Sequence, residues 1–396
     1  MTNGLSGSPE GSFGSFGSFG SFGSFGSFGS FGSFGSFGSF GMPESPVASE
    51  ALITNRDGIV GPTVPFLEHD PRVSHDPVRG LPHFSPVVRA SIFMFEFASR
   101  VAVTVDREGE TPVAQVLSTA VDPGPKHRMT AEPLVRIAAP SIEQLREQTK
   151  YLIAYADLRQ DRAREILVQT SALIPFYASI LYMDPGRTPH TLEFLYTALS
   201  CANVLYMRIK YGLALPRPIE FSPQIQPAIP TPTHPTLPSG HATEAFLLAR
   251  LIWKLRRHST HHPDSKQEAV WGEMLMRQAS RIAVNRTVAG VHFPVDSVAG
   301  AILGLTLADF IWSLGEKKIE TRSTADFDGH LFPADEDFHW HDLYDPKDDQ
   351  QRSSAGKKGR HWMTSSTKKT KGDEAGSEAF RWLRHRALAE WEKPID

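Results

Sequence analysis

The chain has little of several features that define common protein classes. It contains a single cysteine, Cys201, among 396 residues, which excludes an intramolecular disulfide framework and fits a reducing compartment. It also has no excess of positive charge, since 41 Lys and Arg against 44 Asp and Glu give a net charge of −3. Proteins that bind nucleic acid without sequence preference need a strong excess of basic residues. We therefore expect no nucleic-acid partner.

The sequence also lacks a recognisable secretory signal and a clear membrane span. Its first residues, MTNGLSGSPEG, contain neither a basic region nor an apolar core. The longest uncharged and mostly apolar stretch, residues 166–183, is just long enough to be considered as a span, but it has polar residues at 169–171 and is interrupted by Pro175. We interpret this stretch as a buried core helix. The sequence thus predicts a soluble, cytoplasmic protein without stable membrane insertion.

The N-terminal part of the chain is of low complexity. Residues 11–41 are an uninterrupted Gly-Ser-Phe tandem, whose period of three matches neither a helix nor a strand. We predict a disordered tail over residues 1–48. Weak cohesion between the phenylalanines is one interpretation of the tandem, and a repeat expansion with no selected role is the other. Residues 49–140 are Pro-rich, and we predict an irregular arm with some helix.

Helical spacing of apolar residues dominates the rest of the chain. Ser141 is predicted to be an N-cap, with Gln144 completing a capping box. Helices are expected from residue 141, over 164–174, about 191–209, 241–257, 266–289 and 294–314, and in a C-terminal segment, EAFRWLRHRALAEWEK. Strands do not alternate with helices in this pattern, which argues against a parallel sheet. The predicted fold is an all-α bundle, with a catalytic domain at 141–320 and, at 321–396, a polar insertion and a C-terminal helix packed on the same domain.

Three segments combine residues suited to holding an oxyanion. They are Lys210 to Pro218 (KYGLALPRP), PSGH at 238–241, and RTVAGVHFPVD at 286–296. Lys210, Arg217 and Arg286 supply three positive charges, and each guanidinium offers a planar fork of donors. The second segment adds a hydroxyl and, at the expected start of a helix, a glycine whose N–H favours an anion.

The third segment also pairs a histidine with a carboxylate. His292 and Asp296 are four residues apart, so the carboxylate can accept one ring N–H and leave the other nitrogen as a nucleophile or ligand. Pro294 fits the first turn of a helix, which places His292 just before that helix. His241, beside the serine and glycine of the second segment, is free to act as a general acid or base.

Each segment also has an ordinary interpretation. Lys210 and Arg217 could belong to a solvated basic face, Ser239 could be a helix cap, and Asp296 could stabilise a helix dipole. In this order, however, the segments match the pattern K-x6-RP…PSGH…R-x5-H-x3-D. The chain thus resembles the phosphatidic acid phosphatase type 2 and vanadium haloperoxidase superfamily over about residues 200–300, and the helical context extends the resemblance to about 141–315.

The resemblance implies a vanadate cofactor, or a phosphate group, bound by these residues. The residues that resemble the family's oxyanion ligands are Lys210, Arg217, Ser239, Gly240 and Arg286. His292 resembles the histidine that bonds vanadium or attacks phosphorus, His241 the acid–base residue, and Asp296 the partner of His292; Lys210 would also polarise bound peroxide. One departure is visible, because Asn285 precedes Arg286 where the family usually has serine.

The resemblance leaves three alternatives: a haloperoxidase, a phosphatase and a non-enzymatic scaffold. The family's lipid phosphatases span membranes several times, and its soluble acid phosphatases are shorter and have secretory signals. His234, five residues before Ser239, resembles a residue near the metal of the bromide-oxidising haloperoxidases, although a histidine in a Pro-rich loop can be merely structural. Met207 stands where the chloride-oxidising branch has tryptophan. We therefore predict a haloperoxidase that uses hydrogen peroxide with bromide or iodide.

A phosphatase acting on phosphate monoesters through a phosphohistidine at His292 is the first alternative. A non-catalytic scaffold with an inherited anion pocket is the second. A homo-oligomeric assembly remains open on sequence grounds.

Overall fold

The computed structural model describes residues 46–60, 76–121, 129–259, 265–357, 360–370 and 374–392. Of the predicted disordered tail, 1–48, residues 1–45 lie outside the described residues, including the Gly-Ser-Phe tandem, and residues 46–48 begin α1. The described residues up to Ile92 form one compact unit, and those from Phe93 onward form a second. The first unit contains α1 (Pro46–Ile59), α2 (Pro77–Gly80), the 3-10 turn η4 (Leu81–His83) and the beginning of α3 (Pro86–Ala98). Within it, the Arg89 guanidinium donates to the carbonyl oxygens of Leu81 and Phe84.

The second unit combines a helical layer with a six-stranded sheet, so the predicted all-α fold is wrong and the fold is mixed α/β. The strands are β1 (Val101–Glu108), β2 (Thr111–Val121), β3 (Met129–Ala138), β4 (Thr321–Asp328), β7 (Ser354–Lys357) and β8 (Arg360–Lys369). Their order is β1-β2-β3-β4-β8-β7, with β3 and β4 parallel and the other neighbours antiparallel. A separate two-stranded sheet pairs β5 (Tyr344–Asp345) with β6 (Gln350–Gln351).

The sequence did contain a signal for the first hairpin. Valines alternate with other residues at 101, 103 and 105, which is the period of a strand. Gly109, at the turn before β2, adopts φ +64°, a conformation that favours glycine. The β3–β4 pair leaves no such local signal, because Val135 pairs with Ala325 across nearly the whole helical domain.

Most of the predicted helices are confirmed with small shifts of their ends, but the helix predicted over 164–174 is wrong, because the chain turns at 170–173 and forms two helices, α5 (Arg159–Gln169) and α6 (Ile174–Leu181). The confirmed helices are α4 (Ile142–Ala154), α7 (Pro189–Leu213), α8 (Gly240–Ser259), α9 (Ser265–Val288), α10 (Pro294–Leu314) and α11 (Glu378–Ala389). The capping box of α4 is present, since Gln144 N donates to Ser141 Oγ and Ser141 N to Gln144 Oε1. The apolar stretch at 166–183 is divided between α5 and α6.

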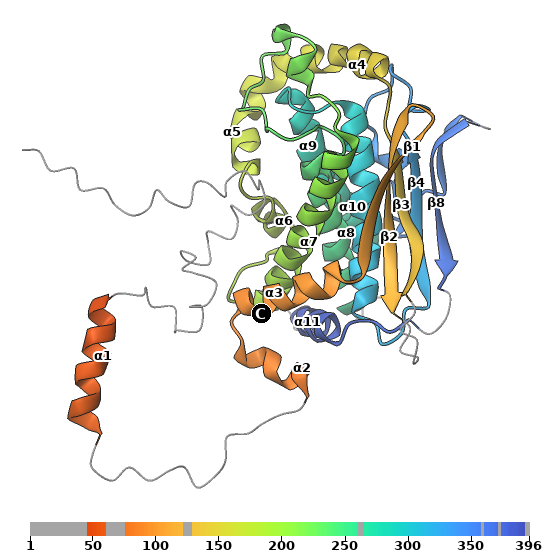
Figure 1. Cartoon of the computed structure of the whole chain (residues 1–396). Helices are drawn as coiled ribbons and strands as arrows, with labels where there is room; N and C mark the ends of the chain where they lie inside the picture. The colour runs from red at the N-terminus through yellow and green to blue at the C-terminus, as the bar shows by residue number, and fades with distance from the viewer. Residues whose placement is uncertain are drawn as a thin grey trace, which may run out of the picture. The chain divides into compact units, whose positions relative to one another are not determined.

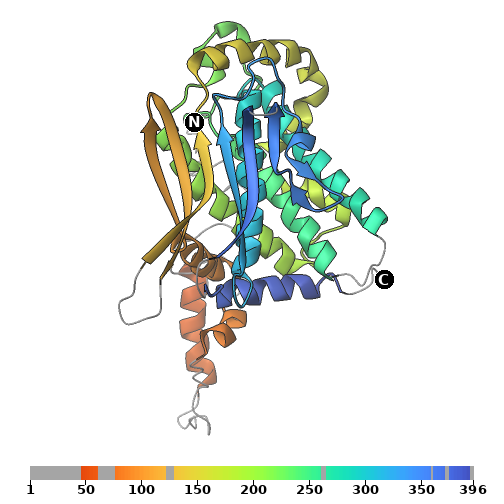
Figure 2. The same cartoon turned by 90° about the vertical axis from the view of Figure 1, so that its right-hand side faces the viewer.

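Helices α7 to α10 run beside one another, and the sheet covers one side of this layer (Figure 1). Turned by 90°, the sheet lies in front of the helices, and α11 crosses below the strands (Figure 2). Helix α10 packs between α8 and β4. By length and composition, α10 alone among the described helices could cross a membrane, but nearly all of its apolar window is buried inside the protein.

Two glycines of α10 let it approach α8 closely. A Cβ at Gly300 would lie 2.5 Å from the carbonyl oxygen of Ser239, and one at Gly304 would lie 2.3 Å from that of Thr243. Only glycine allows this contact between backbones. As a result, the beginnings of α8 and α10, which hold the second and third predicted segments, lie side by side, and Ser239 N donates to the carbonyl oxygen of Asp296 at 2.9 Å.

Candidate active site

Lys210 lies in the last turn of α7 and is fully buried. Its ammonium donates to the carbonyl oxygens of Pro235 and Thr236 at 3.0 and 2.8 Å. An ammonium has three N–H groups, so one donor remains beyond these two bonds. Burial, and then the nearby Arg217 charge, hold the pKa of Lys210 well below its ordinary value. A buried cation in this state gains from a nearby anion.

Arg217 connects the loop before α8 to the loop before α10. Its Nε donates to the His234 carbonyl oxygen at 2.8 Å, and one terminal nitrogen to the Val291 carbonyl oxygen at 2.8 Å. The guanidinium also lies 3.1 Å from His292 Nε2 and 2.9 Å from His234 Nδ1. Because a guanidinium only donates, both imidazole nitrogens must be acceptors. Burial lowers the pKa of Arg217 to about 10, which leaves it charged at neutral pH.

The imidazole of His292 is fixed from its other side by Asp296. His292 Nδ1 lies 2.9 Å from Asp296 Oδ2, and the same carboxylate oxygen accepts from Phe293 N at 2.9 Å and from the Thr236 hydroxyl. Burial raises the pKa of the Asp296 carboxyl, and these hydrogen bonds oppose the rise. The arrangement places the imidazole proton on Nδ1 and leaves the Nε2 lone pair directed at Arg217.

Arg286 lies in the last turn of α9 and is fully buried. One terminal nitrogen donates to Gln169 Oε1 at 2.8 Å and to the Ile166 carbonyl oxygen at 3.2 Å. Its Nε and its other terminal nitrogen have no partner among the described residues. Burial lowers the pKa of Arg286 to about 10. Buried donors without an acceptor are costly, so these nitrogens mark a place where an acceptor belongs.

The PSGH segment opens α8. Ser239 Oγ accepts from Ala242 N at 3.3 Å, the ordinary capping contact, and Gly240 is the first residue of the helix. A Cβ at Gly240 would lie 3.0 Å from the Tyr206 ring, so this tight packing disfavours a larger residue. The His241 Nε2 donates to the Gln169 carbonyl oxygen at 2.9 Å, which leaves Nδ1 unprotonated in the neutral ring. Burial, and then Arg286, lower the pKa of His241 to about 3.

The structure brings the predicted residues into two connected groups. In the first, Arg217 contacts His234 and His292, and Thr236 joins Lys210 to Asp296 through its carbonyl and hydroxyl oxygens. In the second, Gln169 joins Arg286 to His241. The groups are close enough for charge on each to act on the other, because Lys210 and Arg217 both depress the pKa of His241.

Sequence reasoning missed two members of this arrangement. Thr236 lies two residues before the PSGH segment and two after His234, in a Pro-rich loop whose sequence gives threonine no particular role. Gln169 is a polar residue within an apolar stretch. That position was the available signal, and in the structure the residue is 1% exposed, as a buried polar partner would be.

The donor set suits a phosphate or vanadate ion. Arg217 contacts the Nε2 lone pair of His292, and burial, then Arg217 and Lys210, lower the pKa of that imidazole. Arg286, whose charge acts on His241, adds unpaired nitrogens. Asp296 Oδ2 is already bound to His292, Thr236 and Phe293. Oxyanions accept hydrogen bonds at every oxygen and carry the opposite charge. Lys210, Arg217 and Arg286 could therefore bind the oxygens, with His292 Nε2 directed at the central atom.

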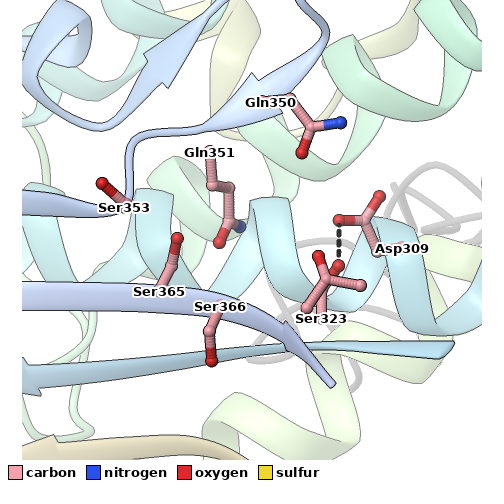
Figure 3. Close-up of a pocket in the computed structure, with 8 residues that line it drawn as sticks. Asp309, Ser323, Gln350, Gln351, Ser353, Ser365 and Ser366 are labelled. Atoms are coloured by element: carbon pink, nitrogen blue, oxygen red, sulfur yellow. Dashed lines mark hydrogen bonds between the residues drawn. The ribbon is translucent and has the colours of Figure 1, made fainter. Parts of the chain in front are cut away.

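A pocket lined by other residues has a different character. This cavity of about 180 Å³ lies between α10 and the strands β4, β6 and β8 (Figure 3). Hydroxyl and amide side chains line it, and its single charged residue is Asp309, whose carboxylate accepts from Ser323 Oγ at 2.8 Å. Its lining contains no cation or histidine, so it does not suit an oxyanion.

Comparison with known families agrees with this geometry. The PAP2 superfamily model matches residues 191–320, from the first turn of α7 to the residue before β4. The match includes the residues from Lys210 to Asp296 and supports the PAP2 superfamily for this segment. Members of that superfamily are typically enzymes, including phosphatases and haloperoxidases. No curated protein matches the sequence.

Proposed function

We propose that this protein is a vanadium-dependent haloperoxidase that oxidises bromide or iodide with hydrogen peroxide. The observation that favours this reaction is the contact between Arg217 and two imidazoles, His292 Nε2 at 3.1 Å and His234 Nδ1 at 2.9 Å. His292 suits the role of metal ligand. His234 adds a second, half-buried imidazole beside the same cation, which oxyanion binding alone does not require.

The reaction converts bromide, hydrogen peroxide and a proton into hypobromous acid and water. Bromide loses two electrons, and the O–O bond of the peroxide is broken as it accepts them. Vanadate bound to His292 and held by Lys210, Arg217, Ser239, Gly240 and Arg286 would supply the Lewis acid that activates the peroxide.

The protein's own residues prepare the nitrogen that bonds the metal. Asp296 and Thr236 hold the His292 proton on Nδ1, so Nε2 keeps its lone pair. In the structure Arg217 donates to that lone pair, so it must move aside for a ligand. Its contacts with the His234 and Val291 carbonyl oxygens can keep it near the bound oxygens. The imidazole is therefore oriented before any anion binds.

Two further histidines are suited to moving a proton and to receiving the halide. With its Nε2–H bound to the Gln169 carbonyl oxygen, His241 can take a proton only at Nδ1. Its pKa of about 3 reflects burial and the Arg286 charge, and a bound anion would raise this pKa by offsetting that charge. Burial and then Lys210 lower the pKa of His234 to about 4, so this ring is neutral and offers its Nε2–H as a halide donor.

Hydrolysis of phosphate monoesters is the second candidate. The oriented Nε2 lone pair of His292 also suits a nucleophile: it would form a bond to phosphorus while the ester oxygen leaves, taking up a proton, and water would then cleave the P–N bond. The same cations would stabilise the charge on the transferred group.

Parallel assays separate these functions. Protein loaded with orthovanadate is tested for bromide- and peroxide-dependent bromination of an indicator, and vanadate-free protein for hydrolysis of a chromogenic phosphate monoester. We expect bromination without ester hydrolysis. Ester hydrolysis without bromination would establish the phosphatase instead, and neither activity would favour a non-catalytic scaffold. In the His234→Ala variant we expect a higher KM for bromide, whereas a structural role for His234 would leave that KM unchanged.

A further inference from the structure

Gln169, the last residue of α5, contacts three elements of the candidate site at once. Its Oε1 accepts from Arg286 at 2.8 Å and from Asn285 Nδ2 at 3.1 Å, and its backbone carbonyl oxygen accepts from His241 Nε2 at 2.9 Å. The carbonyls of a helix's last turn have no partner within the helix, which explains why this one is available to His241. Gln169 is thus placed between the second and third sequence segments.

The neighbours of Gln169 determine which way its amide points. Arg286 and the Asn285 amide nitrogen can only donate, so the atom between them must be the carbonyl oxygen. The amide nitrogen, Gln169 Nε2, is then directed elsewhere, and it is buried without a partner in the part of the chain that the structure describes. Arg286 Nε and one terminal nitrogen share that condition.

Unpaired buried donors on two side chains that touch each other call for a shared acceptor. Leaving such a donor unsatisfied costs about 1–3 kcal/mol, more when it is charged. One oxyanion could satisfy the nitrogens of both Gln169 and Arg286. A neutral amide is well suited to this place, because it adds a donor without adding a fourth positive charge to Lys210, Arg217 and Arg286, whose pKa values are already depressed.

We infer that Gln169 is a further anion-binding residue of the site, with Nε2 donating to the oxyanion that Arg286 binds and Oε1 fixing the Arg286 guanidinium. This inference rests on the proposed function. It also accounts for Asn285, which stands where the family usually has serine: its amide donates to Gln169 and to Glu165 Oε2, and its Oδ1 accepts from Arg162. The last two turns of α5 thereby form a wall of the anion site.

Two isosteric substitutions test the inference through direct binding of inorganic phosphate and of orthovanadate, measured by isothermal titration calorimetry. Gln169→Glu keeps an acceptor for Arg286 and Asn285 but replaces the Nε2 donor with a negative oxygen, so we expect affinity for both anions to fall at least about 100-fold. Gln169→Met removes the donor and the acceptor without adding charge, and we expect a loss of about 10-fold. The methionine variant removes both a buried unpaired amide nitrogen and the Oε1 acceptor, but Arg286 keeps the Ile166 carbonyl oxygen and Asn285 keeps Glu165 Oε2 as partners. Its unfolding free energy should therefore not fall in parallel with affinity.

Gln278→Glu is the matched control. Gln278 also buries an unpaired amide nitrogen within the described residues, but it lies about two turns before Arg286 on α9. We expect its anion affinities to stay within about twofold of wild type. If wild-type protein binds neither anion, the proposed function fails; if wild type binds both and the Gln169 variants bind equally well, only the role of Gln169 is overturned. Should Gln169→Glu fail to fold by circular dichroism, the methionine variant decides.

Discussion

The molecule contains two clusters of buried basic side chains, which differ in the partners of their charged groups. In the second half of α8, Arg250 donates to both oxygens of Asp309 and to Asp349 at 2.8–3.1 Å, and Lys254 lies 3.0 Å from Asp309. At the candidate site the cations contact backbone carbonyls, imidazoles and an amide. Carboxylates pair directly with the cations of the first cluster, whereas none forms an ion pair with Lys210, Arg217 or Arg286 among the residues that the structure describes.

The pKa values express the same difference. Burial alone would lower the pKa of Arg250, yet the Asp309 and Asp349 carboxylates raise it above its ordinary value. At Arg217 the Asp296 and Glu220 carboxylates offset burial only in part, and at Arg286 burial acts alone, so the pKa of each is lowered to about 10. A buried ion pair is a structural element, whereas buried cations that lack an ion-pair partner suit an external anion, as proposed above.

The largest expected effect is on stability, from breaking the ion-paired cluster. Arg250→Met leaves Asp309 and Asp349 without their main partner, so we expect the free energy of unfolding to fall by about 3–5 kcal/mol. Urea denaturation measures this loss. Arg286→Met, which strands no carboxylate, should change stability far less. Equal destabilisation by the two substitutions would contradict the distinction between the clusters.

The next effect is on activity, at the cluster of Lys210, Arg217 and Arg286. Arg286→Met removes donors aimed at the oxyanion, and we expect bromide oxidation by the orthovanadate-loaded protein to fall about 10²- to 10³-fold. Arg208→Met is the control, because Arg208 is an exposed arginine of α7 beside Tyr211. An unchanged rate in the Arg286 variant would remove this residue from the site.

The cluster of Arg250, Lys254 and Asp309 should also make the stability of the protein depend on pH. Arg250 and Lys254 lower the pKa of Asp309 to about 2, despite burial, from an ordinary 3.8. Its stabilising effect is therefore complete above about pH 4 and is lost as pH falls toward 2, by roughly 2 kcal/mol. Unfolding free energies measured between pH 5 and 2 should decline less steeply in Asp309→Asn, whose stability is already reduced at pH 5. Identical slopes would show that Asp309 is not the titrating group.

The smallest expected effect concerns the orientation of the imidazole. Thr236→Val removes the hydroxyl that donates to Asp296 Oδ2 while keeping the side-chain shape. We expect a loss of about 1–2 kcal/mol, or roughly 10-fold, in kcat/KM for bromide. Thr306→Val is the control, since the Thr306 hydroxyl donates to the Ile302 carbonyl oxygen within α10. A similar loss in both variants would indicate a general packing effect.

Sequence patterns predicted the structural elements that depend on residues close together in the chain. Helical periodicity and the Ser141 capping box placed the helices, because both arise from residues a few positions apart. The first hairpin was missed although the valines at 101, 103 and 105 alternate with the period of a strand, because residues 49–140 were predicted to be an irregular arm. The rest of the sheet could not be foreseen, because the β3–β4 pairing joins residues about 190 positions apart.

The prediction of the site residues was limited in the same way. Lys210, Arg217, Arg286 and His292 could be named from the spacing of the segments, because each segment is short. Gln169 could not be assigned a partner, since its contacts with Arg286 cross 117 positions of the chain. A polar residue within an apolar stretch indicates a buried contact but does not identify it.

Titration with orthovanadate followed by ⁵¹V NMR tests most directly whether Lys210, Arg217 and Arg286 form one oxyanion site. We predict one protein-bound vanadium resonance per chain, displaced by inorganic phosphate, retained in Arg250→Met protein that remains folded, and lost in Arg286→Met and His292→Ala. The absence of a bound resonance in wild type, or its persistence unchanged in both site variants, would contradict the account.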